Sequence, residues 1–246
     1  MKTLACYHLK GGVGKTATSV NLGYLLAARG ATTLIWDLDP QGATTFYFRV
    51  KPKVKGGVRR LLDRDGDPLR AVRGTDYEGL DLLPADFSAR HLDIVIEHAK
   101  KPKRRFASVL KTLRKHYDYV LLDCAPSIGL ASESMFRAVD ALVVPVIPTT
   151  LSLHSLEQLC DHLDDLKKSP RVWPFFSMVD RRKALHREVC DQARSMPYDF
   201  LEAMIPYSSH VERMGVRRAP LPSYAPTSSA ARAYRKLVDE IVERSR

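Results

Sequence analysis

Short runs of apolar residues alternate along the chain with longer segments in which apolar residues recur at the spacing of a helix. The short runs predict strands, and the longer segments predict helices that pack through one apolar face. Regular alternation of the two predicts βαβ units, and therefore an α/β fold with a doubly wound, mostly parallel sheet. The expected strands are Leu4–Tyr7, Thr32–Asp37, Leu80–Pro84, Tyr119–Asp123, Ala141–Pro145, Val172–Val179 and Phe200–Ile205. The expected helical segments are Ala17–Arg29, Phe87–Ala99, Phe106–Lys115, Leu153–Lys168, Leu185–Ser195 and Ser228–Arg244.

Two strongly basic stretches interrupt this pattern. Arg49–Arg60 holds six basic residues and no acidic one, and Lys100–Arg105 holds five basic residues in six. Both are expected to be exposed loops or helix starts. No internal repeat and no low-complexity linker divides the chain, which predicts a single domain over residues 1–246.

The most informative polar segment follows the first expected strand. Residues 8–16 read His-Leu-Lys-Gly-Gly-Val-Gly-Lys-Thr, and a helical segment comes directly after them. A strand, a glycine turn and a helix start, in this order, are the setting of a phosphate-binding loop. The glycines let several backbone N–H groups point at one anion, and the helix N-terminus adds partial positive charge. Lys15 is expected to reach the terminal phosphates, and the Thr16 hydroxyl to complete a Mg²⁺ site.

Three carboxylates come at the ends of expected strands. Asp37 and Asp39 end the second strand two residues apart, so their side chains begin on one face. Asp123 ends another apolar strand and is followed by Cys-Ala-Pro-Ser. Because ligands of parallel sheets bind at the carboxyl ends of strands, all three are expected beside the phosphate loop. Alone, each would fit an exposed turn or strand end; together they predict groups that bind Mg²⁺ and orient the attacking water. The Pro126 turn is a candidate sensor of the γ-phosphate.

Composition and charge narrow the class of partner. The chain of 246 residues is 45% hydrophobic and carries a net charge of +11, which predicts a globular protein with a polyanionic partner, nucleic acid first and an anionic membrane second. A merely basic, soluble surface is the alternative.

No apolar run is long enough for a transmembrane segment, and no signal peptide is expected. The four cysteines form no C-x-x-C pair and indicate reduced thiols in a cytoplasmic protein.

Three motifs together resemble one family. Lys-Gly-Gly-Val-Gly-Lys-Thr at 10–16, Asp-Leu-Asp-Pro-Gln-Gly at 37–42 and Asp-Cys-Ala-Pro-Ser at 123–127 are similar to those of the ParA family of deviant Walker A partition ATPases, close to its Soj and MinD members. The likeness continues through 141–150, 177–182, Ile205-Pro206 and the closing helix, so it covers nearly the whole chain. No helix-turn-helix segment precedes the loop here, as in the short, Soj-like branch.

The resemblance implies a P-loop fold, slow ATP hydrolysis and an ATP-bound homodimer. Lys10 would be the signature lysine that crosses to the partner subunit's phosphates, and Lys15 would act within its own subunit. Asp39 would position the hydrolytic water, and Thr16, Asp37 and Asp123 would support Mg²⁺. The positions expected to contact nucleotide are Lys10, Gly11, Gly12, Val13, Gly14, Lys15, Thr16, Ala17 and Pro206.

The resemblance also implies partners and a location. Family dimers bind DNA without sequence preference, and a centromere-binding or cargo-adaptor protein stimulates hydrolysis, so the expected location is the cytoplasm, associated with the nucleoid. The cargo would be a plasmid, a chromosome or a protein assembly. Candidate DNA contacts fall in two basic clusters and are Arg181, Arg182, Arg187, Arg213, Arg217 and Arg218.

Several residues depart from the family pattern, and two alternatives remain. Leu9 replaces a more polar residue, and Ala17 stands where a second hydroxyl usually contacts the α-phosphate, so a backbone N–H or Thr18 must replace it. A MinD-like membrane ATPase would use an amphipathic tail, but the apolar stripe near the C-terminus carries no bulky aromatic anchor and favours a packed helix. An iron–sulfur carrier would need cysteines that meet across the dimer axis, and no second cysteine has a suitable spacing beside Cys124.

Overall fold

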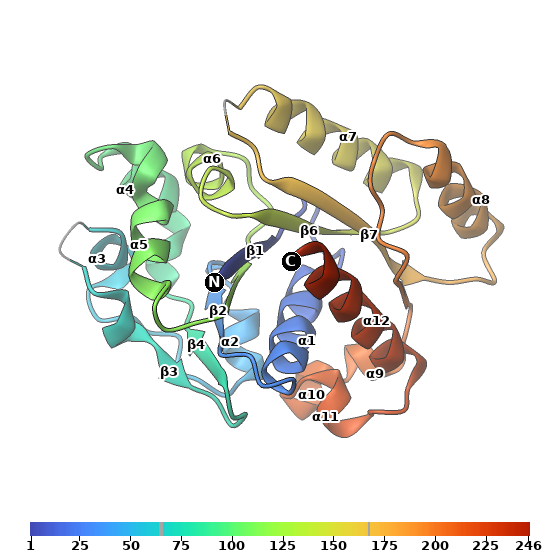
Figure 1. Cartoon of the computed structure of the whole chain (residues 1–246), viewed down its shortest axis with the longest axis horizontal. Helices are drawn as coiled ribbons and strands as arrows, with labels where there is room; N and C mark the ends of the chain where they lie inside the picture. The colour runs from blue at the N-terminus through green and yellow to red at the C-terminus, as the bar shows by residue number, and fades with distance from the viewer. Residues whose placement is uncertain (64–65, 167) are drawn as a thin grey trace.

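A computed structural model of the chain describes residues 1–63, 66–166 and 168–246. Within these residues, eight strands form one sheet in the order β3-β4-β2-β5-β1-β6-β7-β8 (Figure 1). All neighbouring strands are parallel except β3 and β4. The predicted α/β fold with a mostly parallel sheet is confirmed. The strands are β1 Lys2–Cys6, β2 Thr33–Asp37, β3 Arg73–Gly74, β4 Leu80–Leu83, β5 Tyr119–Asp123, β6 Ala141–Val146, β7 Arg171–Val179 and β8 Met204–Pro206.

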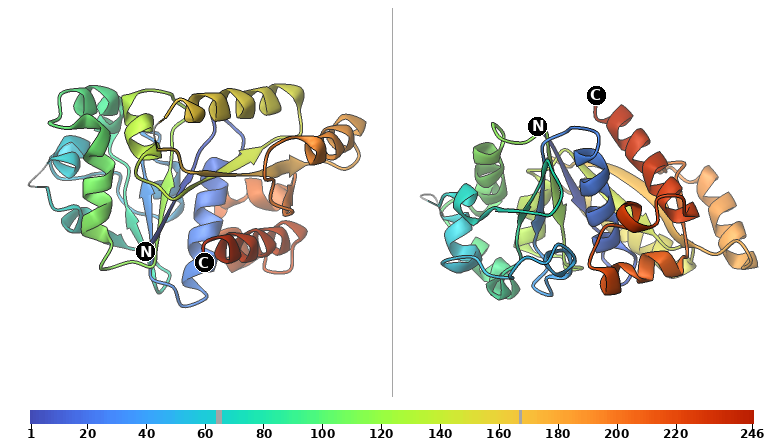
Figure 2. Two further views of the ribbon diagram at one scale, coloured as in Figure 1. Left: turned by 45° about the horizontal axis from the view of Figure 1, so that its top comes forward. Right: turned by 90° about the horizontal axis from the view of Figure 1, so that it is seen from below.

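Helices flank the sheet on both faces, as Figure 2 shows. The α-helices are α1 Lys15–Ala27, α2 Ala43–Tyr47, α3 Gly57–Leu62, α4 Leu92–Glu97, α5 Arg105–Leu113, α6 Leu130–Phe136, α7 Thr150–Asp164, α8 Ala184–Gln192, α9 Ser209–Glu212, α10 Met214–Arg217, α11 Leu221–Tyr224 and α12 Ser229–Arg244. Short 3-10 turns are η1 Pro68–Ala71, η2 Phe87–His91, η3 Pro102–Arg104 and η4 Ala193–Ser195. No helix of the described residues is long and apolar enough to cross a membrane.

Two apolar cores separate the sheet from its helical layers. Alternate strand residues face opposite layers, so that Ala5 and Trp36 belong to one core while Leu4 and Ile35 belong to the other. Helices α3 to α8 bury their apolar residues in the first core, and α1, α10, α11 and α12 bury theirs in the second. Both faces of the central strands are therefore buried, which explains why the sequence of each of these strands is a continuous apolar run.

Some expected elements differ from the observed ones. The expected strand Phe200–Ile205 overlaps β8 only at Met204 and Ile205. Phe200 lies before the strand, with its ring stacked on that of Phe176 at 4.8 Å between centroids. The expected helix Phe87–Ala99 is divided into the 3-10 turn η2, which the Asp86 carboxylate caps by accepting from Ser88 N–H, and the helix α4, which ends at Glu97. Helix α7 ends at Asp164, and residue 167 of the expected Leu153–Lys168 segment lies outside the described residues.

Candidate nucleotide site

The loop between β1 and α1 is bent by glycines in the left-handed region. Gly12 has a φ of 74° and Gly14 a φ of 99°, conformations that residues with a side chain rarely adopt. A methyl group at Gly14 would also stand 3.0 Å from Ser177 Oγ. Gly11 and Gly12 have open space where a side chain would lie, whereas Val13 is fully buried and anchors the loop in the core. The loop can therefore bring its backbone close to a bound anion.

Helix α1 begins directly after Gly14 and leaves its first turn open. It has no side-chain cap and no acidic residue in that turn, and the first N–H groups of a helix have no partner within it. Thr18 is fully buried, and its Oγ1 donates to the Gly14 carbonyl oxygen over 2.8 Å. Because that hydroxyl is already engaged, the backbone N–H at Ala17 is the remaining donor where the family usually has a second hydroxyl.

The two lysines of the loop lie in different environments. Lys15 is only 7% exposed, and its Nζ donates to the Lys10 carbonyl oxygen over 3.1 Å. Burial lowers the pKa of Lys15, and the nearby Asp123 carboxylate acts in the opposite direction. Lys10 is exposed, and its N–H donates to Nδ1 of the buried His8 over 2.9 Å. Lys15 is thus held inside the site, while Lys10 is free to reach outward.

Two buried carboxylates lie side by side next to this loop. Asp37 and Asp123 are register partners at the carboxyl ends of β2 and β5. The N–H and hydroxyl of Thr45 donate to Asp37 Oδ2 over 2.8 and 2.7 Å. The Thr44 hydroxyl donates to Asp123 Oδ2 over 2.7 Å, and the Ser19 hydroxyl donates to Asp123 Oδ1 over 3.1 Å. These hydroxyls fix both carboxylates at the edge of the sheet.

The electrostatics of this pair favour a bound cation. Burial raises the pKa of Asp37, and the charge of Asp123 raises it further. The pKa of Asp123 is also raised, mainly by burial, although hydrogen bonds from hydroxyls including that of Thr16 oppose the shift. No set of three or more His, Cys, Asp or Glu in residues 1–63, 66–166 and 168–246 could hold a metal ion by itself. The oxygen donors fit Mg²⁺, which commonly takes one or two carboxylates and completes its shell with phosphate and water.

Asp39 lies just outside this buried pair. Strand β2 ends at Asp37, so Asp39 is in the following turn and does not continue the strand face as the two-residue spacing predicted. Its N–H donates to Asp37 Oδ1 over 3.3 Å, and its Oδ1 accepts from Gln41 N–H over 2.9 Å. Asp39 is half-buried, so the turn gives it a fixed position with access to solvent.

The loop after β5 is tied to the phosphate loop. Tyr7 donates from its hydroxyl to the Ser127 carbonyl oxygen over 2.7 Å. A cavity of about 340 Å³ next to this bond is lined by Tyr7, Pro40, Cys124 and Ser127 among others. Pro126 therefore lies between the buried Asp123 and Ser127, whose carbonyl oxygen is bonded to Tyr7 just before the phosphate loop. Pro206 is half-buried at the end of β8, opposite Val179 of β7.

The first arginine cluster follows β7. Arg181, Arg182 and Arg187 are exposed. Arg182 is engaged by Asp180 through two bonds of 2.9 Å from Nε and Nη2, and Arg187 donates to the Arg181 carbonyl oxygen over 2.6 Å. The hydrogen bonds from Arg182 lower the pKa of Asp180 to about 2. The loop is therefore basic, but Arg182 already has a carboxylate partner.

The second arginine cluster follows β8. Arg213 and Arg217 are exposed. The Arg218 guanidinium carbon lies 4.4 Å from the centroid of the Phe46 ring, and Nε donates to the Phe46 carbonyl oxygen over 3.0 Å. Arg218 therefore joins α10 to α2 in addition to carrying charge. The structure thus places the six predicted arginines in two clusters, after neighbouring strands at the same edge as the phosphate loop.

Four polar residues of the site were not singled out in the sequence. Ser19, Thr44 and Thr45 hold the paired carboxylates, and His8 accepts from the loop backbone. The position of Thr44-Thr45, soon after Asp-Leu-Asp-Pro-Gln-Gly, was the available signal. Without the fold, buried hydroxyls of this kind cannot be told from ordinary helix residues.

A parallel α/β sheet with a glycine loop before α1 and carboxylates at adjacent strand ends defines a P-loop nucleoside-triphosphatase fold. The model of the AAA domain family matches residues 1–172. The chain is 30% identical over 247 residues to the sporulation initiation inhibitor protein Soj of Bacillus subtilis (strain 168), with 98% of each chain covered. It is 30% identical over 255 residues to the chromosome partitioning protein ParA of Caulobacter vibrioides (strain NA1000 / CB15N), covering 100% of this chain and 96% of the relative.

A solved structure has a similar fold. The crystal structure of cobyrinic acid a,c-diamide synthase from Mycobacterium smegmatis, with bound ADP and magnesium, has a TM-score of 0.83 and 27% sequence identity, and the match covers 99% of this chain and 94% of that one. The chain belongs to the ParA/Soj family of partition ATPases with a deviant Walker A loop.

Proposed function

We propose that the chain is a Mg²⁺-dependent ATPase that dimerises around ATP, binds DNA without sequence preference in that state, and positions a plasmid, chromosome or protein cargo. The observation that carries the proposal is one shared edge. The phosphate loop, the Asp37–Asp123 pair and both arginine clusters follow the carboxyl ends of strands in one sheet. Nucleotide binding at this edge can therefore change how the DNA-contacting segments are presented.

The site's own residues account for nucleotide binding. The loop N–H groups around Gly11 to Gly14 and the open first turn of α1 would hold the phosphates. Lys15 would contact the terminal phosphates, which its confinement beside the loop favours. Thr16, Asp37 and Asp123 would hold Mg²⁺ directly or through water, and the ion would supply charge that offsets the phosphates and the buried carboxylates.

Hydrolysis would depend on Asp39 and Lys10, which are less buried than Lys15. Asp39 would orient the attacking water, since its turn leaves it half-buried beside the pair. Lys10 would reach the phosphates of the partner subunit, because it is exposed at the loop while Lys15 occupies the interior. In a single chain, the phosphates would thus lack the positive charge that Lys10 of a partner subunit supplies. ATP turnover would therefore be slow until two chains dimerise. A centromere-binding or cargo-adaptor protein would stimulate it further.

DNA binding would come from the arginines that follow β7 and β8. A dimer doubles each cluster, and binding driven by release of counterions grows with the number of phosphate contacts. The name of the ParA relative, a chromosome partitioning protein, supports a role in chromosome positioning, and DNA binding would associate the protein with the nucleoid.

The membrane-bound alternative finds little support in the closing helix. Leu237, Val238 and Ile241 of α12 are at most 1% exposed. They pack in the core beside α1 and β8, so the stripe is already covered and is not available to insert into lipid.

A direct experiment separates the proposal from this alternative. Molar mass by light scattering and DNA binding by fluorescence anisotropy are measured with ATP, with ADP and without nucleotide. The expected result is a dimer that binds duplex DNA tightly only with ATP at about 100 mM salt. Binding of the ATP form to anionic vesicles but not to DNA would replace the proposal by the membrane-bound alternative.

A further inference from the structure

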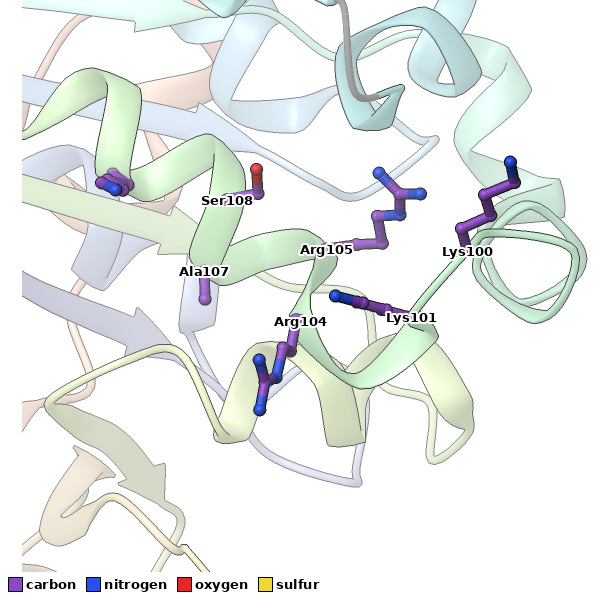
Figure 3. A pocket seen from close by; sticks show the side chains of 7 residues that line it. Lys100, Lys101, Arg104, Arg105, Ala107 and Ser108 are labelled. Carbon is purple, nitrogen blue, oxygen red and sulfur yellow. The ribbon is translucent and has the colours of Figure 1, made fainter.

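The second basic stretch lines a cavity that the proposed function does not use. A hollow of about 540 Å³ lies over η3 and the first turns of α5. In Figure 3 the side chains of Lys100 and Arg105 extend to one side of the start of α5 and that of Arg104 to the other, while Ser108 lies further along the helix. The side chains that matter here are five cations and one hydroxyl, those of Lys100, Lys101, Arg104, Arg105, Lys111 and Ser108.

No ion pair neutralises these cations within the described part of the chain. Arg105 Nη1 donates to the Leu62 carbonyl oxygen over 3.4 Å, and its Nε is buried without a hydrogen-bond partner among the described residues. Like charges gathered around one hollow repel each other, and a bound polyanion removes that repulsion. The cavity therefore has the charge of an anion site.

The local backbone departs from ordinary helix preferences at the same place. Arg104 occupies the N-cap of α5 without a capping hydrogen bond, and no acidic residue stands in the first turn. Lys101 has a φ of 66°, a region that side chains disfavour. Helix N-termini favour negative charge, so cations here are opposed by the helix dipole. The N–H groups of Arg104 and Arg105 already donate to the carbonyl oxygens of Lys101 and Pro102, so an anion here would act by neutralising the cations. Such local conflicts concentrate at functional sites.

The basic surface continues beyond this cavity toward α3. A second hollow of about 330 Å³ lies between α3 and α4. Its polar lining is Arg59, Asp63 and His98, and the neighbouring Ala99 directly precedes Lys100. A third, of about 380 Å³, is lined by Lys55, Arg60, Arg70 and Arg73 and by one acidic residue, Asp67, which pairs with Arg70. A small anion would use one of these hollows. A chain of regularly spaced phosphates would use all three, which favours nucleic acid.

We propose that this α3–α5 basic surface, formed by Lys55, Arg59, Arg60, Lys100, Lys101, Arg104 and Lys111, binds the phosphodiester backbone of nucleic acid in the single, nucleotide-free chain. It is separate from the arginine clusters of the proposed function. Helix α5 packs on β2 through Phe106 and Trp36, whose ring centroids are 5.4 Å apart. The first arginine cluster follows β7 on the other side of β1, and the second lies around α10, which packs in the core on the opposite face of the sheet. Since one chain carries the whole surface, binding requires neither ATP nor a dimer.

The surface has a functional consequence. The monomer stays weakly bound to nucleic acid through the α3–α5 basic surface. Binding of ATP and dimerisation then add the contacts of the arginine clusters that follow β7 and β8. Without specific base contacts, the affinity depends on salt and not on sequence.

The test uses a matched pair of double variants in the whole chain. Lys100→Ala/Arg104→Ala removes one lysine and one arginine from the surface. Arg114→Ala/Lys115→Ala removes the same charges at the other end of α5, where both residues are also exposed. Anisotropy of a fluorescent duplex is measured without nucleotide at about 50 mM salt and above, and ATP turnover without DNA checks that each variant is folded.

We expect the parental chain to bind duplexes of different sequence alike. Lys100→Ala/Arg104→Ala weakens this binding by at least about tenfold and flattens the slope of log K against log salt by about 1.8, while Arg114→Ala/Lys115→Ala changes neither appreciably. The proposal is overturned by no binding without nucleotide, by equal losses in the two variants, or by binding of anionic vesicles in place of DNA. Each of these leaves ATP-dependent binding through the arginine clusters, and so the proposed function, to be judged separately.

Discussion

Asp37 and Asp123 stand opposite each other at the ends of two adjacent parallel strands, and both carboxylates are buried beside Lys15. Burial raises the pKa of both carboxyls, and the charge of Asp123 raises that of Asp37 further, so a cation beside them is favoured. Lys15 supplies one positive charge to this corner of the site. The arrangement suits a lysine that contacts phosphate and a divalent ion that links phosphate to protein.

Replacing Lys15 by alanine tests the phosphate loop. The change removes the buried ammonium that faces the loop, so ATP turnover should fall at least about a hundredfold. Phosphate release from the purified chain measures it, and Lys115→Ala is the control for loss of a lysine elsewhere. A Lys15→Ala chain with parental turnover would contradict the loop assignment.

Lys10→Ala and Asp39→Ala should have opposite effects on the dimer. Lys10→Ala removes the exposed charge proposed for the partner subunit's phosphates, so ATP-driven dimerisation weakens while the monomer stays folded. Asp39→Ala removes the group proposed to orient water, so the ATP-bound dimer persists. Light scattering over time after ATP addition follows both, and normal dimerisation by the Lys10→Ala chain would exclude the cross-subunit role.

The sequence predicted the central strands and the loop well because their determinants are local. Tyr119–Asp123 was predicted with the observed bounds, as a continuous apolar run between polar residues. The glycines and Lys15 are recognisable from spacing alone. The same holds for Asp37 and Asp123, whose meeting follows from parallel pairing.

Elements that depend on distant partners were not predictable in the same way. Helix α2 carries Thr44 and Thr45 inward, where their hydroxyls donate to the carboxylates of Asp123 and Asp37, and the Thr45 hydroxyl also accepts from the Ala85 N–H. The two-residue strand β3 is stabilised by antiparallel pairing with β4, which no periodicity reveals. The engagement of Arg218 by Phe46 likewise joins residues far apart in the sequence.

DNA binding in the ATP state should depend on exposed arginines of the second cluster. Arg213→Ala/Arg217→Ala is a cleaner change than any at Arg218, because Arg218 also packs on Phe46. Binding to all sequences should weaken alike, and the slope of log K against log salt should flatten by about 1.8. Anisotropy with ATP measures this. ATP turnover without DNA should stay near the parental rate, and unchanged DNA affinity would remove this cluster from the interface.

Stability should depend on His8 in mildly acidic solution. Burial, assisted by the charge of Lys15, lowers the pKa of His8 to about 4, so the folded state favours the neutral ring that accepts from Lys10 N–H. The unfolded chain binds the proton first as pH falls. The contribution is therefore complete above the unfolded pKa of about 6.5 and is lost as pH falls toward about 4.

His8→Asn isolates this effect, because asparagine can accept the same hydrogen bond but does not titrate. Between pH of about 7 and about 4, the parental chain should lose roughly 2–3 kcal/mol more unfolding free energy than the variant. Asp37 and Asp123 titrate in both chains, so their contributions largely cancel. Urea unfolding without nucleotide gives the values, with the exposed His116→Asn as control. Equal pH dependence in the parental and His8→Asn chains would show that His8 is not the responsible group.

The ion pair between Asp180 and Arg182 should limit DNA affinity. Asp180 holds the Arg182 guanidinium through two hydrogen bonds, yet the Arg182 side chain is 87% exposed. The Asp180 side chain is only 15% exposed, but the guanidinium end of the pair lies in solvent, so a phosphate can compete for the arginine. Asp180→Asn removes the competing charge, and DNA binding in the ATP state should tighten severalfold, with a salt slope steeper by about 0.9. Asp239→Asn provides the matched control, because it breaks the pair between Asp239 on α12 and Arg29 in the turn after α1, away from both basic regions. If Asp180→Asn and Asp239→Asn raise the affinity equally, the gain reflects net charge alone, and Arg182 does not contact DNA.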